Sequence, residues 1–84
     1  MTPVRLLKTI DFFQRKYEID AAYVDQLWKE FGTSVRVARR DKRIGLKSFS
    51  ASLGCSRAFV GFLESGKRQW NFDMARKAVK LLSK

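Results

Sequence analysis

Apolar side chains recur every three or four residues in the first part of the chain, which is the spacing of one face of an α-helix. The first such stripe comprises Leu6, Ile10, Phe13 and Tyr17. The second comprises Val24, Leu27, Trp28 and Phe31. Thr2 and Asp20 stand ahead of the two stripes, at the positions that N-caps occupy. The pattern predicts two amphipathic helices, one beginning at about residue 3 and one spanning about 21–31.

The sequence leaves the end of the second helix open. Gly32 is of a type that commonly ends a helix, and Thr33 or Ser34 could then cap a third helix that reaches about Arg43. The apolar face, however, continues in register into Val35, which favours a helix that runs through. We expect a break at Gly32, with the uninterrupted helix as the alternative.

Residues 46–65 (LKSFSASLGCSRAFVGFLES) carry the pattern of two short helices joined by a tight turn. The apolar positions that would hold these helices together are Phe49, Cys55, Val60 and Leu63. Ser50 is small where the helices cross, Gly54 accepts the positive φ of a chain reversal, and Ser56 is a candidate N-cap. The spacing is typical of a helix-turn-helix with helices at about 46–53 and 56–64. An ordinary αα-hairpin is the alternative.

A last helix is expected at about 72–83. Asn71 can cap its beginning, and Gly66 can end the helix before it. Its apolar positions are Phe72, Ala75, Val79 and Leu82. No stretch of the chain alternates apolar and polar residues in the manner of a strand. The sequence therefore predicts an all-α fold with about five to six helices.

The charge is distributed unevenly along the chain. It has 18 Lys and Arg against 8 Asp and Glu, a net charge of +10. Residues 1–31 hold five of each sign, so the whole excess belongs to residues 32–84. A positive surface on the part that carries the two-helix motif is typical of phosphate binding. A charge that serves only solubility is the alternative, and the spread over several short elements disfavours a membrane-surface helix.

The residue types needed for common enzyme chemistry are missing from the sequence. There is no histidine, a single cysteine, Cys55, and no paired-acid or glycine-rich phosphate motif. We therefore expect no enzyme activity, no metal site and no cofactor. Cys55 falls on an apolar position and has no partner cysteine, which favours a packed thiol in a reducing cytoplasm. No apolar run approaches the length of a membrane span.

Residues 33–82 resemble the Cro/phage-repressor (Xre-type) helix-turn-helix family. The segments that carry the likeness are Ile44–Ser50 (IGLKSFS), Leu53–Arg57 (LGCSR) and Leu63–Arg68 (LESGKR). The resemblance implies a lambda-repressor-like helix-turn-helix domain. In it, residues 32–84 form the DNA-binding core and residues 1–31 form a two-helix extension, and the two together make one compact domain.

The same resemblance implies that the helix beginning at Ser56 enters the major groove of double-stranded DNA. The candidate base-reading residues are Ser56, Arg57, Ala58 and Phe62. The candidate phosphate-binding residues are Arg43, Lys47, Ser48, Lys67 and Arg68. Arg57 suits guanine O6 and N7, whereas Phe62 suits either a thymine methyl group or a protein surface.

Arg39 and Glu64 lie 25 residues apart. Spacing alone indicates no more than a surface charge pair. The resemblance implies a partly buried structural ion pair, in which the loss of one partner would leave the other charge stranded.

The sequence departs from the family pattern at three places. Leu46 stands where the family usually has a polar side chain that holds a phosphate or base, so Lys47 or Ser48 must serve instead. The outward face of the expected reading helix has almost no hydrogen-bonding side chains. The family core usually ends with a fifth helix that helps dimerisation, and we expect residues 1–31 to provide core cover and a dimer contact in its place.

These observations together predict a sequence-specific DNA-binding transcriptional regulator. We expect a small phage or bacterial repressor that acts in the cytoplasm, as a homodimer, by occupying an operator. Two other functions stay open. An antitoxin-like or phage accessory module would bind a protein partner through the extension, with Phe12 and Phe62 as contacts. The other alternative is a sequence-independent nucleoid binder. It is suggested by the net charge of +10 and by the scarcity of hydrogen-bonding side chains on the expected reading face.

Overall fold

The computed structural model of the chain describes residues 2–16 and 21–83. They form five helices: α1 (Pro3–Lys16), α2 (Ala21–Asp41), α3 (Leu46–Leu53), α4 (Arg57–Ser65) and α5 (Phe72–Leu82). No strand occurs within these two ranges, so the predicted all-α fold is confirmed.

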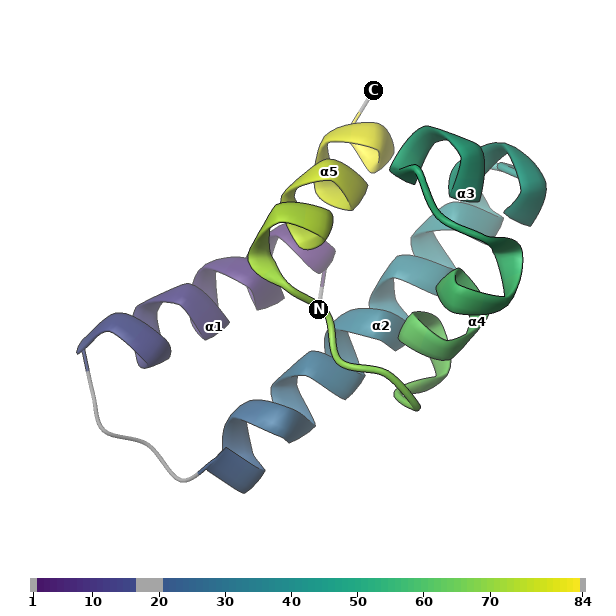
Figure 1. Cartoon of the computed structure of the whole chain (residues 1–84). Coiled ribbons are helices and arrows are strands. Elements are labelled where there is room, and N and C mark those ends of the chain that lie inside the picture. The colour runs from purple at the N-terminus through teal and green to yellow at the C-terminus, as the bar shows by residue number, and fades with distance from the viewer. Residues whose placement is uncertain (1, 17–20, 84) are drawn as a thin grey trace.

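The longest helix, α2, is the centre of the arrangement. It contacts α1, α4 and α5, and α5 in turn contacts α1 and α3. In Figure 1, α3 and α4 lie together on the right, α1 lies on the left, and α5 lies between them near the top. The helix-turn-helix segment therefore occupies one side of the molecule and α1 the other, with α2 joining the two.

Three of the predicted N-caps are present, at Thr2, Ser56 and Asn71. In each, a side-chain oxygen accepts the backbone N–H of the residue three positions on, at 3.3, 3.1 and 2.8 Å for Thr2, Ser56 and Asn71. These bonds satisfy N–H groups that have no partner inside a helix. The fourth predicted cap, Asp20, lies outside the described residues.

The predicted helix break at Gly32 is wrong, because α2 continues through it to Asp41. A Cβ atom at Gly32 would overlap the carbonyl oxygen of Leu63 and lie 3.1 Å from that of Glu64. Glycine is therefore placed here for the close approach of α2 and α4, and not for ending a helix. The Thr33 hydroxyl donates to the carbonyl of Lys29 at 3.2 Å and caps nothing. The expected boundary between residues 31 and 32 falls inside one helix.

The core collects the apolar faces of all five helices. Its most deeply buried large side chains are Ile10, Phe31, Val35, Phe49, Val60 and Leu63. The predicted stripe of α2 is buried throughout, and Leu6 and Ile10 of α1 are buried with it. Side chains of α1 thus contribute to the same core as those of α2. Tyr17 and the side chain of Phe13 lie outside the described part of the chain.

Trp70 is a core residue that the periodicity did not predict. It lies between α4 and α5 and is only 3% exposed. Its indole Nε1 donates to the carbonyl of Leu63 at 3.1 Å, and its ring meets that of Phe31 edge-on at 4.9 Å between centroids. A helical stripe cannot reveal a residue outside a helix. The available signal was a large aromatic side chain in an otherwise polar connection.

Three successive helices, α2, α3 and α4, end in the same way. The residue after the last turn is left-handed, with φ of +58°, +79° and +84° at Arg43, Gly54 and Gly66. The next backbone N–H then donates to the carbonyl five residues earlier, at 3.0, 3.1 and 2.9 Å. This is the Schellman pattern, for which glycine is the usual residue. Among the described residues, Arg43 is the only non-glycine with positive φ.

Candidate nucleic-acid interface

The turn between α3 and α4 is held by short-range contacts. Gly54 provides the left-handed residue, and Ser56 caps α4 two positions later. Cys55, between them, is half-buried against the core, and this burial raises the pKa of its thiol. A protonated thiol is a weak nucleophile, which fits the predicted packing role. Ser50 is buried, and its hydroxyl donates to the carbonyl of Lys47 at 3.0 Å.

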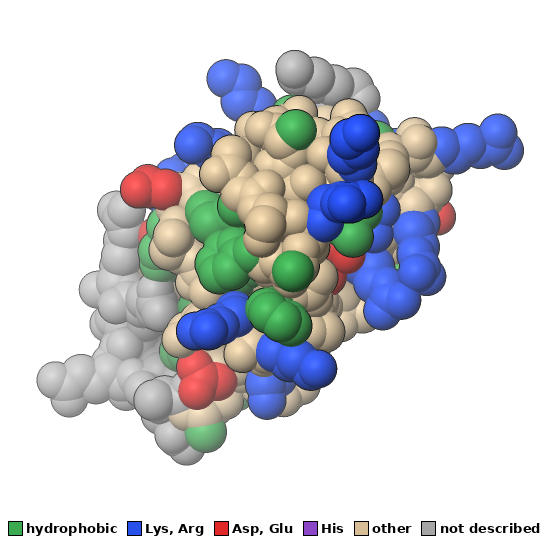
Figure 2. Space-filling view, turned by 45° about the vertical axis from the view of Figure 1, so that its right-hand side comes forward, with side chains coloured by type: hydrophobic (Ala, Val, Ile, Leu, Met, Phe, Trp, Pro, Cys, Tyr) green, Lys and Arg blue, Asp and Glu red, His purple; other side chains and the backbone are tan. Residues whose placement is uncertain are grey.

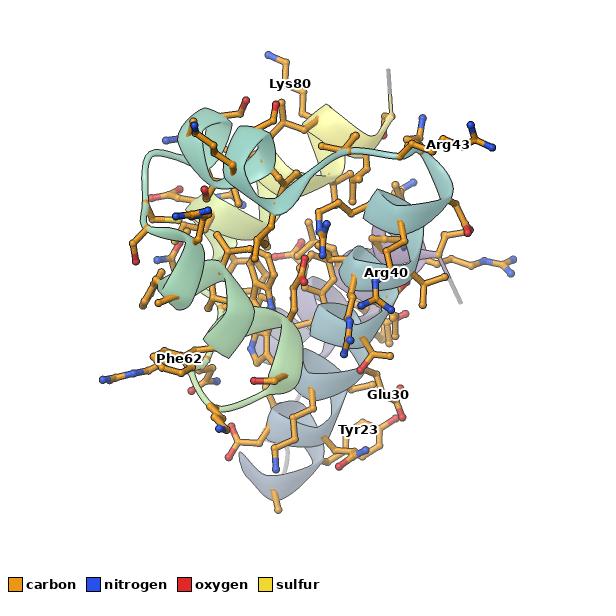
Figure 3. All side chains as sticks on the ribbon, turned by 90° about the vertical axis from the view of Figure 1, so that its right-hand side faces the viewer. Tyr23, Glu30, Arg40, Arg43, Phe62 and Lys80 are labelled. Carbon is orange, nitrogen blue, oxygen red and sulfur yellow. The ribbon has the colours of Figure 1, made fainter. Side chains whose placement is uncertain are left out.

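The α4 helix has one face in the core and one in solvent. Val60 and Leu63 are fully buried, and Phe59 is half-buried at the core edge. The outward residues comprise the four predicted base-reading positions, and all of them are exposed: Ser56, Arg57, Ala58 and Phe62. The structure thus brings these four together along the outside of one short helix. Phe62 points away from the body of the molecule (Figure 3).

The polar capacity of this outward face is limited. The Ser56 oxygen already accepts the N–H of Phe59, so its hydroxyl proton is what remains for a ligand. Arg57 makes no ion pair or hydrogen bond with the residues that the structure describes. The ammonium nitrogen of Lys67 lies 5.9 Å from the ring centroid of Phe62, so a cation covers part of that ring. Arg57 is therefore the main hydrogen-bond donor that this face offers to a ligand.

Lysine and arginine side chains lie at both ends of the α3–α4 pair. Lys47 and Ser48 are exposed in the first turn of α3, and Lys67 and Arg68 are exposed directly after α4. Lys67 and Arg68 line a hollow of about 190 Å³ together with residues of α2, including Lys29. Exposed lysine or arginine side chains thus lie both at the beginning of α3 and after the end of α4.

Arg43 is placed differently from the other phosphate-binding candidates. It follows α2 directly and is exposed. Figure 3 shows Arg43 at the upper right and Phe62 projecting at the left, so the structure does not bring the two side by side.

The Arg39–Glu64 ion pair forms as predicted, and it is buried. Arg39 Nε donates to Glu64 Oε2 at 2.9 Å, and Nη2 donates to Oε1 at 3.2 Å. The remaining Nη1 donates to the carbonyl of Ile44 at 3.0 Å. The two residues are 8% and 5% exposed. A two-point contact of this kind fixes the orientation of α4 relative to α2.

The sequence analysis missed two exposed arginines on α2. Arg36 and Arg40 lie one turn apart and line a groove between α2 and α4. Their four-residue spacing within a stretch that was predicted to be helical was the signal present in the sequence. In Figure 2, which turns the α3–α4 side forward, Lys and Arg side chains gather on the right and along the lower edge, and few Asp or Glu side chains appear.

Searches of known protein families, curated proteins and solved structures found no match for this chain. A family assignment therefore stays a prediction from the helix-turn-helix motif. None of the described helices has an apolar stretch that is long enough to cross a membrane. Within residues 2–16 and 21–83, no three Asp, Glu, Cys or His side chains gather into a metal-binding cluster.

Proposed function

We propose that this protein is a sequence-specific regulator of transcription that binds double-stranded DNA. The observation that carries the proposal is the exposed outward face of α4, which has lysine and arginine side chains at both of its ends. An α-helix presented in this way fits the width of the major groove. The net charge of +10 supports attraction to phosphates. Repression would follow from occupancy of an operator, as the resemblance to Cro and phage repressors implies.

The proposed roles divide along the interface. Arg57 is assigned to guanine, and Ala58 and Phe62 are assigned to thymine methyl groups, with Ser56 as a further donor. The phosphate contacts are assigned to Lys47, Ser48, Lys67 and Arg68, and to Arg43 at the margin. Backbone contacts would supply most of the affinity, because the reading face offers few hydrogen bonds.

Selection of binding sites from a random duplex pool, followed by sequencing of the survivors, tests this proposal. The expected result is an enriched motif in which guanine and thymine positions alternate with unselected ones. Two half-sites about one helical turn apart, roughly 34 Å, would fit a homodimer, which is the proposed active form. Sedimentation of the full chain at high micromolar concentration tests the dimer directly, and a monomer there contradicts it.

One observation favours a second function, that of a sequence-independent nucleoid binder. The centre of the outward face is apolar, with Ala58 and Phe62 exposed and few donors between them. Such a surface could bind backbone without choosing a sequence. The same selection experiment separates the two functions, because a nucleoid binder would enrich no motif while still retaining duplexes.

The exposure of Phe12 and Phe62 favours a third function, binding of a protein partner. Their side chains are 47% and 40% exposed. Aromatic residues are enriched in protein–protein contacts. Retention of a partner protein by the full chain, in the absence of any duplex binding, would support this function over the first.

A further inference from the structure

A groove of about 300 Å³ lies between α2 and α4, beside the outward face of α4. We call it the α2–α4 groove. Arg36 and Arg40 line it from α2, Gly61 and Ser65 from α4, and Leu46 from the start of α3. The Arg39–Glu64 pair lies at its base. Three helices therefore converge on this site, which no step of the proposed reading mechanism uses.

The α2–α4 groove carries two uncompensated positive charges. Arg39 is neutralised by Glu64 through two hydrogen bonds. Arg36 and Arg40 are exposed, and neither forms an ion pair or hydrogen bond with any described residue. Guanidinium groups one helical turn apart can converge on a single anion, and arginine favours phosphate and carboxylate oxygens because it donates in a fork.

Gly61 gives the second, independent observation. It lies inside α4, where glycine is a poor helix former. At Gly32 the neighbouring backbone excludes a side chain, but a Cβ atom at Gly61 would meet nothing within 4 Å. Packing thus gives no reason for this glycine. Gly61 lines the α2–α4 groove, so its missing side chain leaves room for a ligand to approach α4 closely.

The positive charge continues from the groove along α2. Arg36 and Arg40 are four residues apart on one face of α2, and Arg43 follows in the left-handed turn after the helix ends at Asp41. Arginine occupies this left-handed position after α2, whereas glycine occupies the equivalent position after α3 and after α4. Figure 3 shows Arg40 in the centre of the view and Arg43 above it on the right, while Phe62 is at the left edge. Arg40 and Arg43 therefore lie to one side of Phe62, beside the proposed reading face and not on it.

We propose that the α2–α4 groove binds a phosphate of the DNA backbone. Arg36 and Arg40 donate to its oxygens, and Gly61 gives the backbone space to enter. The inference rests on the proposed DNA binding, and it extends the contact from the helix-turn-helix onto α2. The groove adjoins the start of α3 and the middle of α4, so it is continuous with that interface. A phosphate contact here adds affinity for every sequence and no preference among them.

Removal of the two charges tests the contact. Arg36→Gln with Arg40→Gln is compared with Lys77→Gln with Lys80→Gln, which removes the same charge from exposed positions on α5. Binding of the full chain to a selected and a random duplex is measured over a salt series. The groove variant should bind both duplexes about tenfold more weakly, as for the loss of one charged hydrogen bond. Its log–log salt slope should be shallower by about 0.9 for each phosphate lost. Equal effects in the two double variants would overturn the proposal.

A substitution that adds a side chain at Gly61 tests whether a phosphate needs the open space beside this residue. Gly61→Ala should raise Tm by about 4–8 °C, because alanine favours the helix and meets no neighbour. It should nevertheless weaken binding to both duplexes. Ser52→Ala, at an exposed position of α3, is the control in which a better helix former leaves binding unchanged. Full affinity in Gly61→Ala would overturn the groove as a phosphate site. If the wild-type chain binds no duplex, the proposed function fails together with this inference. If the wild-type chain binds duplexes and the groove variants bind them with the same affinity, only this inference fails.

Discussion

Gly32 and Gly61 are both glycines inside helices, and their surroundings give them opposite roles. Gly32→Ala would force a methyl group against the Leu63 carbonyl, so we expect a loss of about 1–3 kcal/mol in the free energy of unfolding. Urea titration followed by circular dichroism measures it. The matched change Gly61→Ala, which meets open space, should shift the midpoint the other way. A Gly32→Ala variant as stable as the wild-type chain would mean that α2 and α4 can separate at little cost.

The buried Arg39–Glu64 pair makes a second prediction at this scale. Glu64→Ala leaves the Arg39 guanidinium without two of its three acceptors at an almost fully buried position, and such losses typically cost about 3–5 kcal/mol. The control is Arg76→Ala, which breaks an exposed pair to Asp73 at 3.0 Å and should cost under about 1 kcal/mol. Thermal unfolding of both variants gives the comparison. Equal shifts in Tm would contradict a structural role for Glu64.

Single residues were predictable where a local rule governs them. The caps at Ser56 and Asn71 follow from side-chain type and position, and the structure has them. The burial of Arg39 and Glu64 was different, because spacing alone indicated a surface pair and only the family resemblance implied burial. Helical periodicity could not reveal Trp70, since its burial depends on the α4 carbonyl and the Phe31 ring that it meets across the fold.

At the scale of elements, the shared ending of α2, α3 and α4 predicts a reciprocal pair of substitutions. Arg43→Gly relieves a left-handed conformation that costs a non-glycine residue about 1–2 kcal/mol, so it should stabilise the fold. Gly54→Ala imposes that cost at the equivalent position of α3 and should destabilise it. Chemical denaturation measures both. A destabilised Arg43→Gly variant would show that the arginine side chain supports the fold through contacts that outweigh its backbone.

The bounds of the elements were predictable except at one point. The expected helices at 46–53, 56–64 and 72–83 differ from α3, α4 and α5 by at most one residue at each end. The error was at Gly32, where two rules disagreed: glycine favours an end, and the continuing apolar face favours a helix. Resolving them required knowing that the backbone of α4 would lie against that glycine, which is a tertiary contact.

For the whole molecule, the proposed interface predicts that affinity and sequence preference can be separated. Arg57→Ala should flatten the preference at one base pair of each half-site, because a two-point contact to guanine contributes about 1–3 kcal/mol of discrimination. Lys67→Ala should weaken selected and random duplexes alike and make the salt slope shallower by about 0.9. Competition titrations of the two duplexes measure both effects. Equal losses for both duplexes in Arg57→Ala would make Arg57 a phosphate ligand.

At this scale the sequence predicted the helical class, but it placed a boundary between residues 31 and 32. Residues 1–31 were expected as a two-helix extension that forms one compact domain with residues 32–84. α2 spans the expected boundary, and Ile10 of α1 is fully buried in the same core as Phe49 and Val60. Composition shows where charge lies along the chain, whereas the sharing of a core depends on which helices meet.

The contact at Gly32 also limits how far α4 can move relative to α2. Side chains between two helices can change rotamer and so absorb a small displacement, but here the α4 backbone rests on the α2 backbone with no side chain between them. The adjacent Arg39–Glu64 clamp resists rolling of one helix over the other. The position and tilt of α4 relative to α2 are thus fixed. In the proposed complex the duplex would have to supply any adjustment of shape, and easily deformed base steps would bind at lower cost than stiff ones. Selection would then extend to base pairs that no side chain touches.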